Sequence, residues 1–498
     1  MLLVASYLVY ILTSISGDPL ADLRQGHAIN KEELIAQRVQ LLHLDVPPYL
    51  RYFIWLGGLL GAFVGKFDLG NAINGQHVTD MLSSAMGSTL TLVTTATIIA
   101  IVVGITVGIT TALRQYAIYD YSATFVSFLF FSLPIFWIAV MLKQYVAIGF
   151  NNFLADPVIG PVGITVIAVI AGVFWLGVIG GSPKQRLLIF GIAAVSTAGV
   201  LTFISLTGWL KDPSLGPVVT TALSLGAAYL ITVLSTGWGN KKARNTSLTV
   251  VAIGLVLYFP LQLLFNQFAI INVFTILLLL VIFAGIGGLV GYLWKGNDRA
   301  QSVRTGAIVA FVTALILLLD RLLKSWSVYF NQVANGRPIA TIGSATPDLQ
   351  ADYWVTQLDS FTHLLLPTLA LILASIAGYS RYSRASLLDV MNQDYIRTAR
   401  AKGLSERTVI MRHAFRNALI PVTTVIALDF GALIGGAVVT ETVFGWSGMG
   451  ALFQQSINTV DVNPIMGVFL VTAIAAVVFN VIADLIYSGL DPRIRVSA

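Results

Sequence analysis

Long uninterrupted runs of apolar residues dominate the chain and alternate with short polar segments. Twelve runs are long enough, or nearly so, to cross a membrane as α-helices, for which about 20 apolar residues suffice. The runs are continuous and lack a period of two, which excludes a membrane β-barrel. The pattern therefore predicts an all-α polytopic integral membrane protein. The expected spans are 1–15, 89–113, 122–147, 158–180, 187–208, 215–236, 247–266, 269–294, 305–323, 362–379, 419–440 and 466–488.

The segment between the first and second spans is polar to mixed. We expect residues 16–87 to form a long external loop that includes a helical piece at Lys31–Leu42. The first run, Met1–Ile15, has no basic flank and is short for a span, so it is not typical of a cleavable signal peptide. It indicates either that the natural start lies upstream or that this helix begins at the membrane interface.

The basic residues between the spans indicate the orientation in the membrane. Cytoplasmic loops of membrane proteins are rich in Lys and Arg. Here these residues gather in alternate loops, while the other loops hold few, such as Lys211 and Arg321. The pattern predicts that both chain ends are cytoplasmic. The residues assigned to the cytoplasmic side are Arg114, Lys184, Arg186, Lys241, Lys242, Arg244, Lys295, Arg299, Arg304, Arg493 and Arg495, with a basic stretch near residue 400.

The composition agrees with this class and excludes others. Of the 498 residues, 56% are hydrophobic and 10% are charged, with a mean hydropathy of +0.84; soluble domains carry about a quarter charged residues. The net charge of +6 reflects membrane orientation and does not indicate nucleic-acid binding. The sequence has no cysteine, which excludes disulfides, thiolate metal sites and cysteine nucleophiles. It also has no Gly-x4-Gly-Lys-Ser/Thr motif, the phosphate-binding signature of many ATPases.

One stretch departs from the apolar pattern. Asp394–Val422 reads DYIRTARAKGLSERTVIMRHAFRNALIPV and contains six Arg and Lys residues. Helix-forming residues up to Lys402 are followed by Gly403, and Ser405 is placed to cap a second helix whose first turn holds Glu406. Two interpretations fit this helix, glycine turn and helix: an amphipathic helix on anionic lipid, or a rigid elbow on which a partner protein pushes. The fixed turn favours the elbow, because a lipid anchor needs none.

The sequences RTARAKGL (397–404) and RHAFRNALIP (412–421) resemble the cytoplasmic coupling segment of a known family. That family comprises the permease subunits of binding-protein-dependent ABC importers, and the resemblance is greatest to its oligopeptide and dipeptide class. Other segments agree with the family in order and jointly cover about residues 1–151 and 342–498. They are Gly17–Pro19, Phe67–Gly70, Ser132–Trp137, His363–Pro367, Gly435–Phe444 and the closing residues Asn480, Asp484, Tyr487, Asp491, Pro492 and Arg493.

The resemblance implies a six-helix importer-type core interrupted by extra helices. Residues 1–151 and 342–498 would form the two parts of that core, with the coupling segment at 392–418. Residues 156–324 would form an inserted bundle of about six spans, giving about 12 transmembrane helices in the bacterial plasma (inner) membrane. Two roles are open for the inserted bundle: a lipid-facing accessory bundle, or a part in transport.

The resemblance also implies a function. The chain would form half of the translocation pathway for peptides or similar small solutes, driven by ATP hydrolysis in partner subunits. Its partners would be a second permease chain, two ATP-binding subunits, an extracytoplasmic substrate-binding protein and membrane lipid. The chain itself would have no catalytic residue and would bind no cofactor or metal, since ATP and Mg²⁺ would be held by the partner subunits. The residues implied in coupling to the ATPase are Arg397, Thr398, Ala399, Arg400, Ala401, Lys402, Gly403, Leu404, Ser405, Glu406, Arg407 and Arg412.

Two acidic residues are candidates for the substrate pathway. Asp429 lies within an expected span, where a carboxylate is costly unless it faces a cavity or a partner. It is placed either to meet the amino group of a peptide or to make a structural hydrogen bond to a neighbouring helix. Glu441 lies near the outer end of the same span, a position suited to docking the binding protein or gating the pore.

Two positions depart from the family pattern. Arg397 stands in place of the Glu that begins the shared Glu-Ala-Ala motif, which is usual for the peptide class. Ser447 stands where the family has Pro, so the rigidity of that loop is open.

The main alternative function is an ion-coupled secondary transporter, for which paired membrane charges and similar halves are expected. A membrane enzyme would need clustered His or acidic residues. The sequence has neither pattern. The exact substrate, whether a peptide, nickel or another solute, stays open.

Overall fold

The chain is described by a computed structural model that covers residues 2–26, 29–267, 271–294 and 299–490, without the side chains of 267, 407, 432–436 and 487–490. Throughout that part the regular structure is helical, apart from an isolated β-bridge between Asn71 and His77. The chain divides into two compact units. The first comprises the chain up to Ile148, Ala340–Ser344 and the chain from His363, and the second comprises Gly149–Ile339 and Ala345–Thr362.

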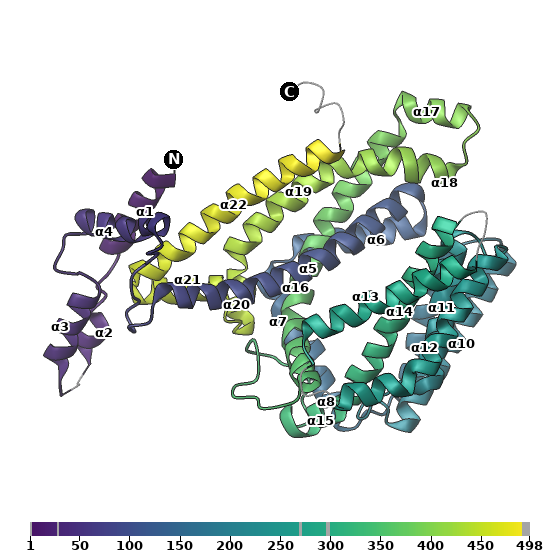
Figure 1. Cartoon of the computed structure of the whole chain (residues 1–498), viewed down its shortest axis with the longest axis horizontal. Helices are drawn as coiled ribbons and strands as arrows, with labels where there is room; N and C mark the ends of the chain where they lie inside the picture. The colour runs from purple at the N-terminus through teal and green to yellow at the C-terminus, as the bar shows by residue number, and fades with distance from the viewer. Residues whose placement is uncertain (1, 27–28, 268–270, 295–298, 491–498) are drawn as a thin grey trace. The chain divides into compact units, whose positions relative to one another are not determined.

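The first unit contains helices from both the N-terminal and the C-terminal parts of the chain, including the long helices α5, α19 and α22 (Figure 1). The long helix α16 begins in the second unit and continues into the first. The helices are α1 (Leu2–Ile15), α2 (Ala21–Gln25), α3 (Lys31–Leu41), α4 (Pro48–Leu60), α5 (Val78–Leu113), α6 (Ile118–Ser132), α7 (Ile135–Met141), α16 (Tyr353–Met391), α17 (Asp394–Ala401), α18 (Glu406–Thr408), α19 (Phe415–Gly436), α20 (Val438–Phe444), α21 (Met449–Thr459) and α22 (Val462–Leu490).

Small residues bring α5 and α16 into close contact. A Cβ atom at Gly104 would lie 2.7 Å from Cβ of Tyr379, and one at Gly108 would lie 2.5 Å from the backbone oxygen of Ser380. Only glycine fits at these two positions. Paired small residues four apart are a common way for membrane helices to approach each other, because lipid provides no hydrophobic force between them.

The structure corrects the predicted third span, Ser122–Ala147. This segment is not one helix, because α6 ends at Ser132 and α7 begins at Ile135. Leu133 has an extended backbone, with φ −83° and ψ 131°, as expected for a residue that precedes a proline. Pro134 therefore ends α6, and a new helix begins at Ile135 and continues to Ala155, beyond the predicted end of the span.

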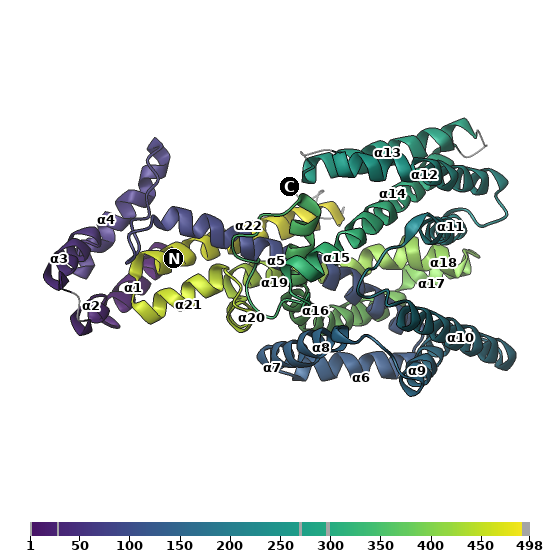
Figure 2. The same cartoon turned by 90° about the horizontal axis from the view of Figure 1, so that it is seen from below.

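The stretch 16–87, expected as an external loop, contains α2, α3, α4, a 3-10 helical turn at Gly61–Val64 and the start of α5. The expected helical piece Lys31–Leu42 is confirmed as α3. Figure 2 shows α1 to α4 together at one end of the first unit, where α1 contacts both α4 and α22. The N-terminal part of the chain is thus a packed helical layer.

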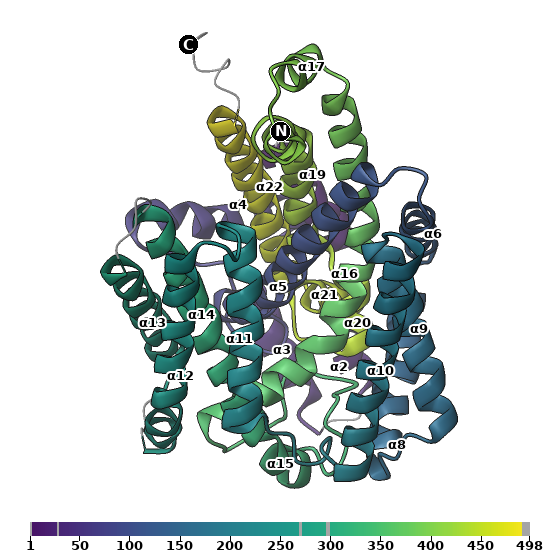
Figure 3. The ribbon, with the colours of Figure 1, turned by 90° about the vertical axis from the view of Figure 1, so that its right-hand side faces the viewer.

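The second unit holds the helices that separate the two parts of the resemblance (Figure 3). α9 and α10 pack on each other as a hairpin. α11 to α14 share one apolar cluster, and α12 to α14 share a second. Six of these helices, α9 to α14, occupy most of 156–324, although the compact unit itself extends beyond both limits. The helices are α8 (Gly149–Ala155), α9 (Pro161–Ile179), α10 (Pro183–Thr207), α11 (Gly216–Ser235), α12 (Lys241–Gln267), α13 (Val273–Leu293), α14 (Arg299–Lys324) and α15 (Trp326–Val328).

The predicted fold class is confirmed. Ten helices in the described part of the chain are long and apolar enough to cross a membrane. Of the two remaining expected spans, the first corresponds to the shorter apolar helix α1, and the one at 419–440 lies largely within α19. The tail residues assigned to the cytoplasm, Arg493 and Arg495, and also Lys295, lie outside the described residues.

A fully buried carboxylate ties the second unit together. Asp320 of α14 is 0% exposed. One of its oxygens accepts hydrogen bonds from the backbone N–H groups of Leu215 and Gly216, at 2.8 and 2.9 Å. The other accepts from the hydroxyl of Tyr258 at 2.7 Å and forms an ion pair with Lys324 at 3.1 Å. Asp320 therefore links α11, α12 and α14 through satisfied bonds, which is the condition for burying a charge.

We expect Asp320→Ala to destabilise the second unit by about 3 kcal/mol, because Lys324 and two backbone donors lose their partner. The measurement is the thermal unfolding midpoint of the purified chain. Asp212→Ala, which removes an exposed carboxylate of the same unit, is the matched control and should leave the midpoint unchanged. Equal midpoints for both variants would contradict the structural role of Asp320.

Candidate functional site

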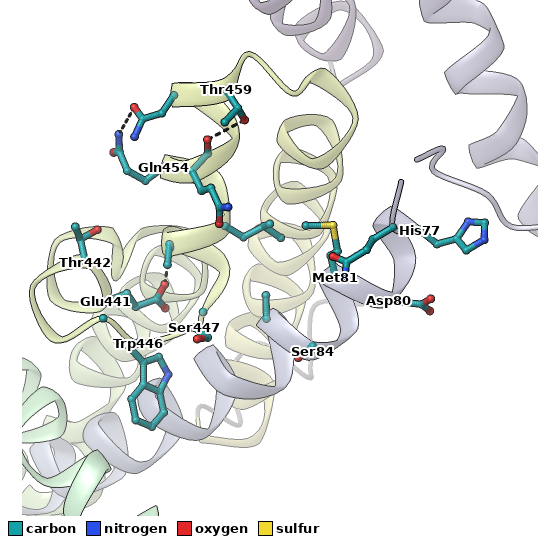
Figure 4. A pocket seen from close by; sticks show the side chains of 18 of the residues that line it. His77, Asp80, Met81, Ser84, Glu441, Thr442, Trp446, Ser447, Gln454 and Thr459 are labelled. Atoms are coloured by element: carbon teal, nitrogen blue, oxygen red, sulfur yellow. Dashed lines mark hydrogen bonds between the residues drawn. The ribbon is translucent and has the colours of Figure 1, made fainter. Parts of the chain in front are cut away.

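A cavity of about 880 Å³ lies in the first unit between the N-terminal end of α5 and the segment Glu441–Thr459. We call it the α5–α21 cavity. Figure 4 shows Glu441 and Gln454 on one side and Met81 and Ser84 of α5 on the other. Amide and hydroxyl groups dominate its polar wall, and such groups both donate and accept hydrogen bonds. They are Gln76, Ser84, Thr442, Ser447, Gln454, Gln455, Asn458 and Thr459.

Glu441, a predicted substrate-pathway residue, lies in the wall of this cavity with both carboxylate oxygens already engaged. Oε1 accepts from the hydroxyl of Thr89 at 2.7 Å, and Oε2 accepts from the backbone N–H of Ala451 at 3.0 Å. The Thr89 hydroxyl in turn accepts from the N–H of Met449 at 2.8 Å. The residue is 0% exposed. Glu441 thus holds the 445–451 loop against α5, and this role is distinct from direct contact with a solute.

Two glycines allow the loop to approach Glu441. A Cβ at Gly448 would lie 2.3 Å from Oε1 of Glu441 and 2.5 Å from the Thr89 hydroxyl. A Cβ at Gly450 would lie 2.6 Å from Cα of Val438. Since Ser447 replaces the proline of the family pattern, the rigidity of this loop comes from the glutamate clasp and from glycine packing.

Asp429, the other predicted pathway residue, does not line the α5–α21 cavity. It lies half-buried on α19 and faces the hydroxyl of Tyr379 on α16. That hydroxyl is buried and has no partner at hydrogen-bond distance among the side chains that the structure describes. The structure therefore does not bring Asp429 and Glu441 together in one site, and it provides Asp429 with a neighbour on the next helix.

The basic stretch forms the predicted elbow, which we define as Asp394–Ala414. α17 is followed by a turn at Gly403, whose φ of +75° suits glycine. The side chain of Ser405 then caps the next helix by accepting from the N–H of Thr408. The sequence prediction of helix, glycine turn, cap and helix is confirmed. Beyond α18 the chain continues as the π-helical segment Val409–Ala414 and joins α19.

The elbow has one buried face and one exposed tip. Residues 401–406 are all exposed. The buried face packs on the C-terminal ends of α5 and α16, so that the elbow is fixed to the two long helices of the unit. The members of this cluster are Ala112, Leu387, Ile396, Ala399, Val409, Ala414 and Ala418.

An ion pair spans the turn. Nη2 of Arg400 lies 2.7 Å from Oε1 of Glu406, and Nε donates to Oε2 at 3.2 Å. Hydrogen bonds from Arg400 lower the pKa of the Glu406 carboxyl. Both groups are well exposed, so the pair contributes little stability and acts mainly to shape the turn. Arg397 is also exposed and lies 3.4 Å from Asp394.

Not every predicted coupling residue lies at the tip. Ala399 is buried in the cluster beneath the elbow, whereas Lys402, Leu404 and Arg412 are exposed. The side chain of Arg407 lies outside the described residues. Sequence reasoning missed Thr89, since a threonine within an apolar span carries no signal of its own.

The two candidate regions lie apart within the first unit, with the elbow near α17 and α18 and the cavity near α20 and α21 (Figure 1). α5 extends between them: its first turns line the cavity and Ala112 packs beneath the elbow. Its 36 residues correspond to roughly 54 Å of helix. One packed helix therefore joins the elbow to the cavity.

Comparisons with known proteins match this chain to membrane components of transport systems. A family model described as "Binding-protein-dependent transport system inner membrane component" matches residues 251–496. The oligopeptide transport system permease protein OppB of Mycobacterium tuberculosis is 36% identical over 225 residues, which is 43% of this chain and 67% of that relative. AppB of Bacillus subtilis, also an oligopeptide transport system permease protein, is 48% identical over 137 residues, 28% of this chain and 43% of the relative. The glutathione transport system permease protein GsiC of Escherichia coli K12 is 43% identical over 137 residues, 28% of this chain and 45% of the relative.

We expect Gly448→Ala to open the 445–451 loop, because the added methyl group overlaps the carboxylate of Glu441. Overpacking of this kind costs about 1–3 kcal/mol, so the loop should open more often. A cysteine placed at the buried position 449 should then react with a maleimide about tenfold faster. The natural chain has no cysteine, so Met449→Cys provides a single site for a maleimide reagent. Gly87→Ala on α5, where an added Cβ meets nothing within 4 Å, is the control. Labelling that is equally fast in both backgrounds would contradict the clasp.

Proposed function

We propose a function from the family to which this chain belongs, the binding-protein-dependent transport system inner membrane components. The chain forms half of the membrane passage of an ABC importer for peptides or similar small solutes. The chain is a multi-pass permease subunit. The proposed substrate class rests on the 36% identity of this chain with an oligopeptide permease, over 67% of that relative. Glutathione, named for another relative, is itself a small peptide.

The second half of the passage would be a similar permease chain. ATP and Mg²⁺ would be bound by two partner ATPase subunits, and an extracytoplasmic binding protein would deliver the solute. We place the complex in the bacterial plasma membrane with the elbow and both termini in the cytoplasm, as the distribution of basic residues predicts.

The elbow is the part of this chain that suits contact with an ATPase. Its tip, residues 401–406, is exposed and carries both an apolar side chain, Leu404, and a basic side chain, Lys402. Its opposite face is packed on α5 and α16. A partner that closes around the tip would displace the ends of both helices, and α5 would pass the movement to the α5–α21 cavity. No chemical step is required of this chain.

In this scheme the amides and hydroxyls of the α5–α21 cavity contact the solute on its way through the membrane. Because they carry no charge, they would accept peptides of different sequence through the backbone. The Glu441 clasp would set the position of the 445–451 loop that borders the cavity. We assign Asp429 to helix packing beside Tyr379, since it does not line this cavity.

We expect Gly403→Val to uncouple the ATPase subunits, because a β-branched residue is strained at a φ of +75°. A strain of about 1–2 kcal/mol predicts that co-purified ATPase falls roughly tenfold. The measurement is co-purification from native membranes with a C-terminal tag. Gly65→Val is the matched control, because Gly65 also has a φ of +75° and open space around it but lies far from the elbow in sequence.

The same experiment discriminates between the two classes of transporter. Loss of the ATPase in Gly403→Val alone, with normal membrane insertion, is the expected result. If the wild-type chain purifies alone and supports uptake that an ion gradient drives, the importer function is wrong and the ion-coupled carrier takes its place.

We expect Asp429→Asn to leave uptake and apparent affinity within about twofold of wild type, because an amide keeps a hydrogen-bonding group beside Tyr379. The measurement is uptake of a labelled peptide in cells. A large rise in apparent KM would return Asp429 to the substrate pathway.

A further inference from the structure

A second cavity lies in the first unit, about 380 Å³ in volume, where the start of α22 meets α1, α3 and α4. We call it the α1–α22 cavity. It shares no lining residue with the α5–α21 cavity and none with the elbow. Its volume lies in the range of small-molecule sites.

A buried carboxylate in this cavity has an unused oxygen. Asp461 is 6% exposed. Its Oδ2 accepts from the backbone N–H of Ile73 at 2.7 Å, whereas Oδ1 is buried and has no hydrogen-bond partner in the part of the chain that the structure describes. Burial raises the pKa of this carboxyl to about 6, although the Ile73 N–H and the nearby Arg38 act in the opposite direction. A buried carboxylate oxygen left without a donor is costly, so this position favours a ligand that supplies one.

A cationic donor in the same cavity is also unused. Nε of Arg51 is buried without a partner, as is the hydroxyl of Ser14. No ion pair joins Arg51 to Asp461 among the described residues. The other charges here are satisfied: Arg24 pairs with Asp18 at 2.7 Å.

The remaining wall is mainly apolar. It includes Tyr10, Leu20, Val39, Leu42 and Val462. The cavity therefore presents a negatively charged hydrogen-bond acceptor, a positively charged hydrogen-bond donor and an apolar surface. A molecule that complements all three has an ammonium group, a carboxylate group and a short apolar body.

We propose that the α1–α22 cavity binds a small zwitterion of the α-amino-acid or short-peptide type, with its ammonium group on Asp461 and its carboxylate on Arg51. The occupant bridges the N-terminal helices and the start of α22, and so stabilises the junction between them. This site goes beyond the proposed function and does not depend on it, because it involves neither the elbow nor an ATPase.

The test uses the purified full chain in lipid nanodiscs without partner subunits. Thermal unfolding is followed with leucine, with dileucine, and with N-acetyl-leucinamide, which has the same side chain but neither charge. A ligand that binds the folded chain raises the midpoint. We expect leucine or dileucine to raise it, and which of the two does so identifies the source of the zwitterion. N-acetyl-leucinamide should have no effect.

Two variants test the assigned contacts separately. Asp461→Asn should weaken binding at least about tenfold, because a charge-assisted hydrogen bond is lost. Arg51→Gln should weaken it similarly and leaves the Asp461–Ile73 bond intact, so it covers the case in which Asp461→Asn does not fold. Asp45→Asn, at an exposed position between α3 and α4, is the control and should bind as wild type does.

The pH dependence supplies an independent readout. The ammonium group requires ionised Asp461, so affinity should fall as the pH drops through 6, roughly tenfold by pH 5. Without a ligand, the folding stability of the protein depends on pH in the opposite direction. A folded-state pKa raised above the usual 3.8 means that protonation favours the folded state, so this carboxyl's contribution to stability improves as the pH falls from 6 towards 4. The proposal is overturned if no zwitterion shifts the midpoint, or if the shift survives in both Asp461→Asn and Arg51→Gln.

Discussion

The first unit depends on the close approach of α5 and α16 at Gly104 and Gly108. Within a membrane, apolar side chains gain little by leaving lipid for one another, so tight backbone packing has to hold the helices together. The two glycines bring the helix backbones within a distance that no larger residue permits. Around this crossing, α5 and α16 share a buried cluster that includes Leu92, Leu371 and Trp446. Both long helices then carry their packing to the elbow.

Buried carboxylates in both units are surrounded by hydrogen-bond donors. Asp120 of α6 pairs with Arg384 of α16 at 2.9 Å and accepts from the N–H of Tyr116, and Glu441 accepts from a threonine and a backbone N–H. Asp320 has donors on three helices. Each carboxylate fixes a junction between elements because it is surrounded by donors that water would otherwise supply. Asp461 is different, since one oxygen has no donor.

Rigid packing joins the elbow to the α5–α21 cavity. The elbow has an exposed glycine turn, but its buried face belongs to the same apolar cluster as the ends of α5 and α16. At the other end of α5, Glu441 and Thr89 hold a loop that contains two glycines in contact with their neighbours. A helix that is packed at both ends moves as a body, because a close-packed interior is not readily deformed. The second unit has its own cores and its own buried carboxylate, so its helices form an independently stabilised bundle.

The sequence by itself determined the membrane class, the positions of nearly all long helices, and the elbow with its glycine turn and serine cap. These follow from local rules, namely the length of apolar runs, the backbone freedom of Gly403 and the capping preference of Ser405. It did not place the break at Pro134 within a continuous apolar run, nor α2 and α4 in 16–87. Only the tertiary structure decided that Glu441 is a clasp, that Asp429 faces Tyr379, and that Asp461 lacks a donor. Those properties depend on Thr89, Tyr379 and Ile73, which are distant in sequence, and no local pattern records which donors folding brings to a carboxylate.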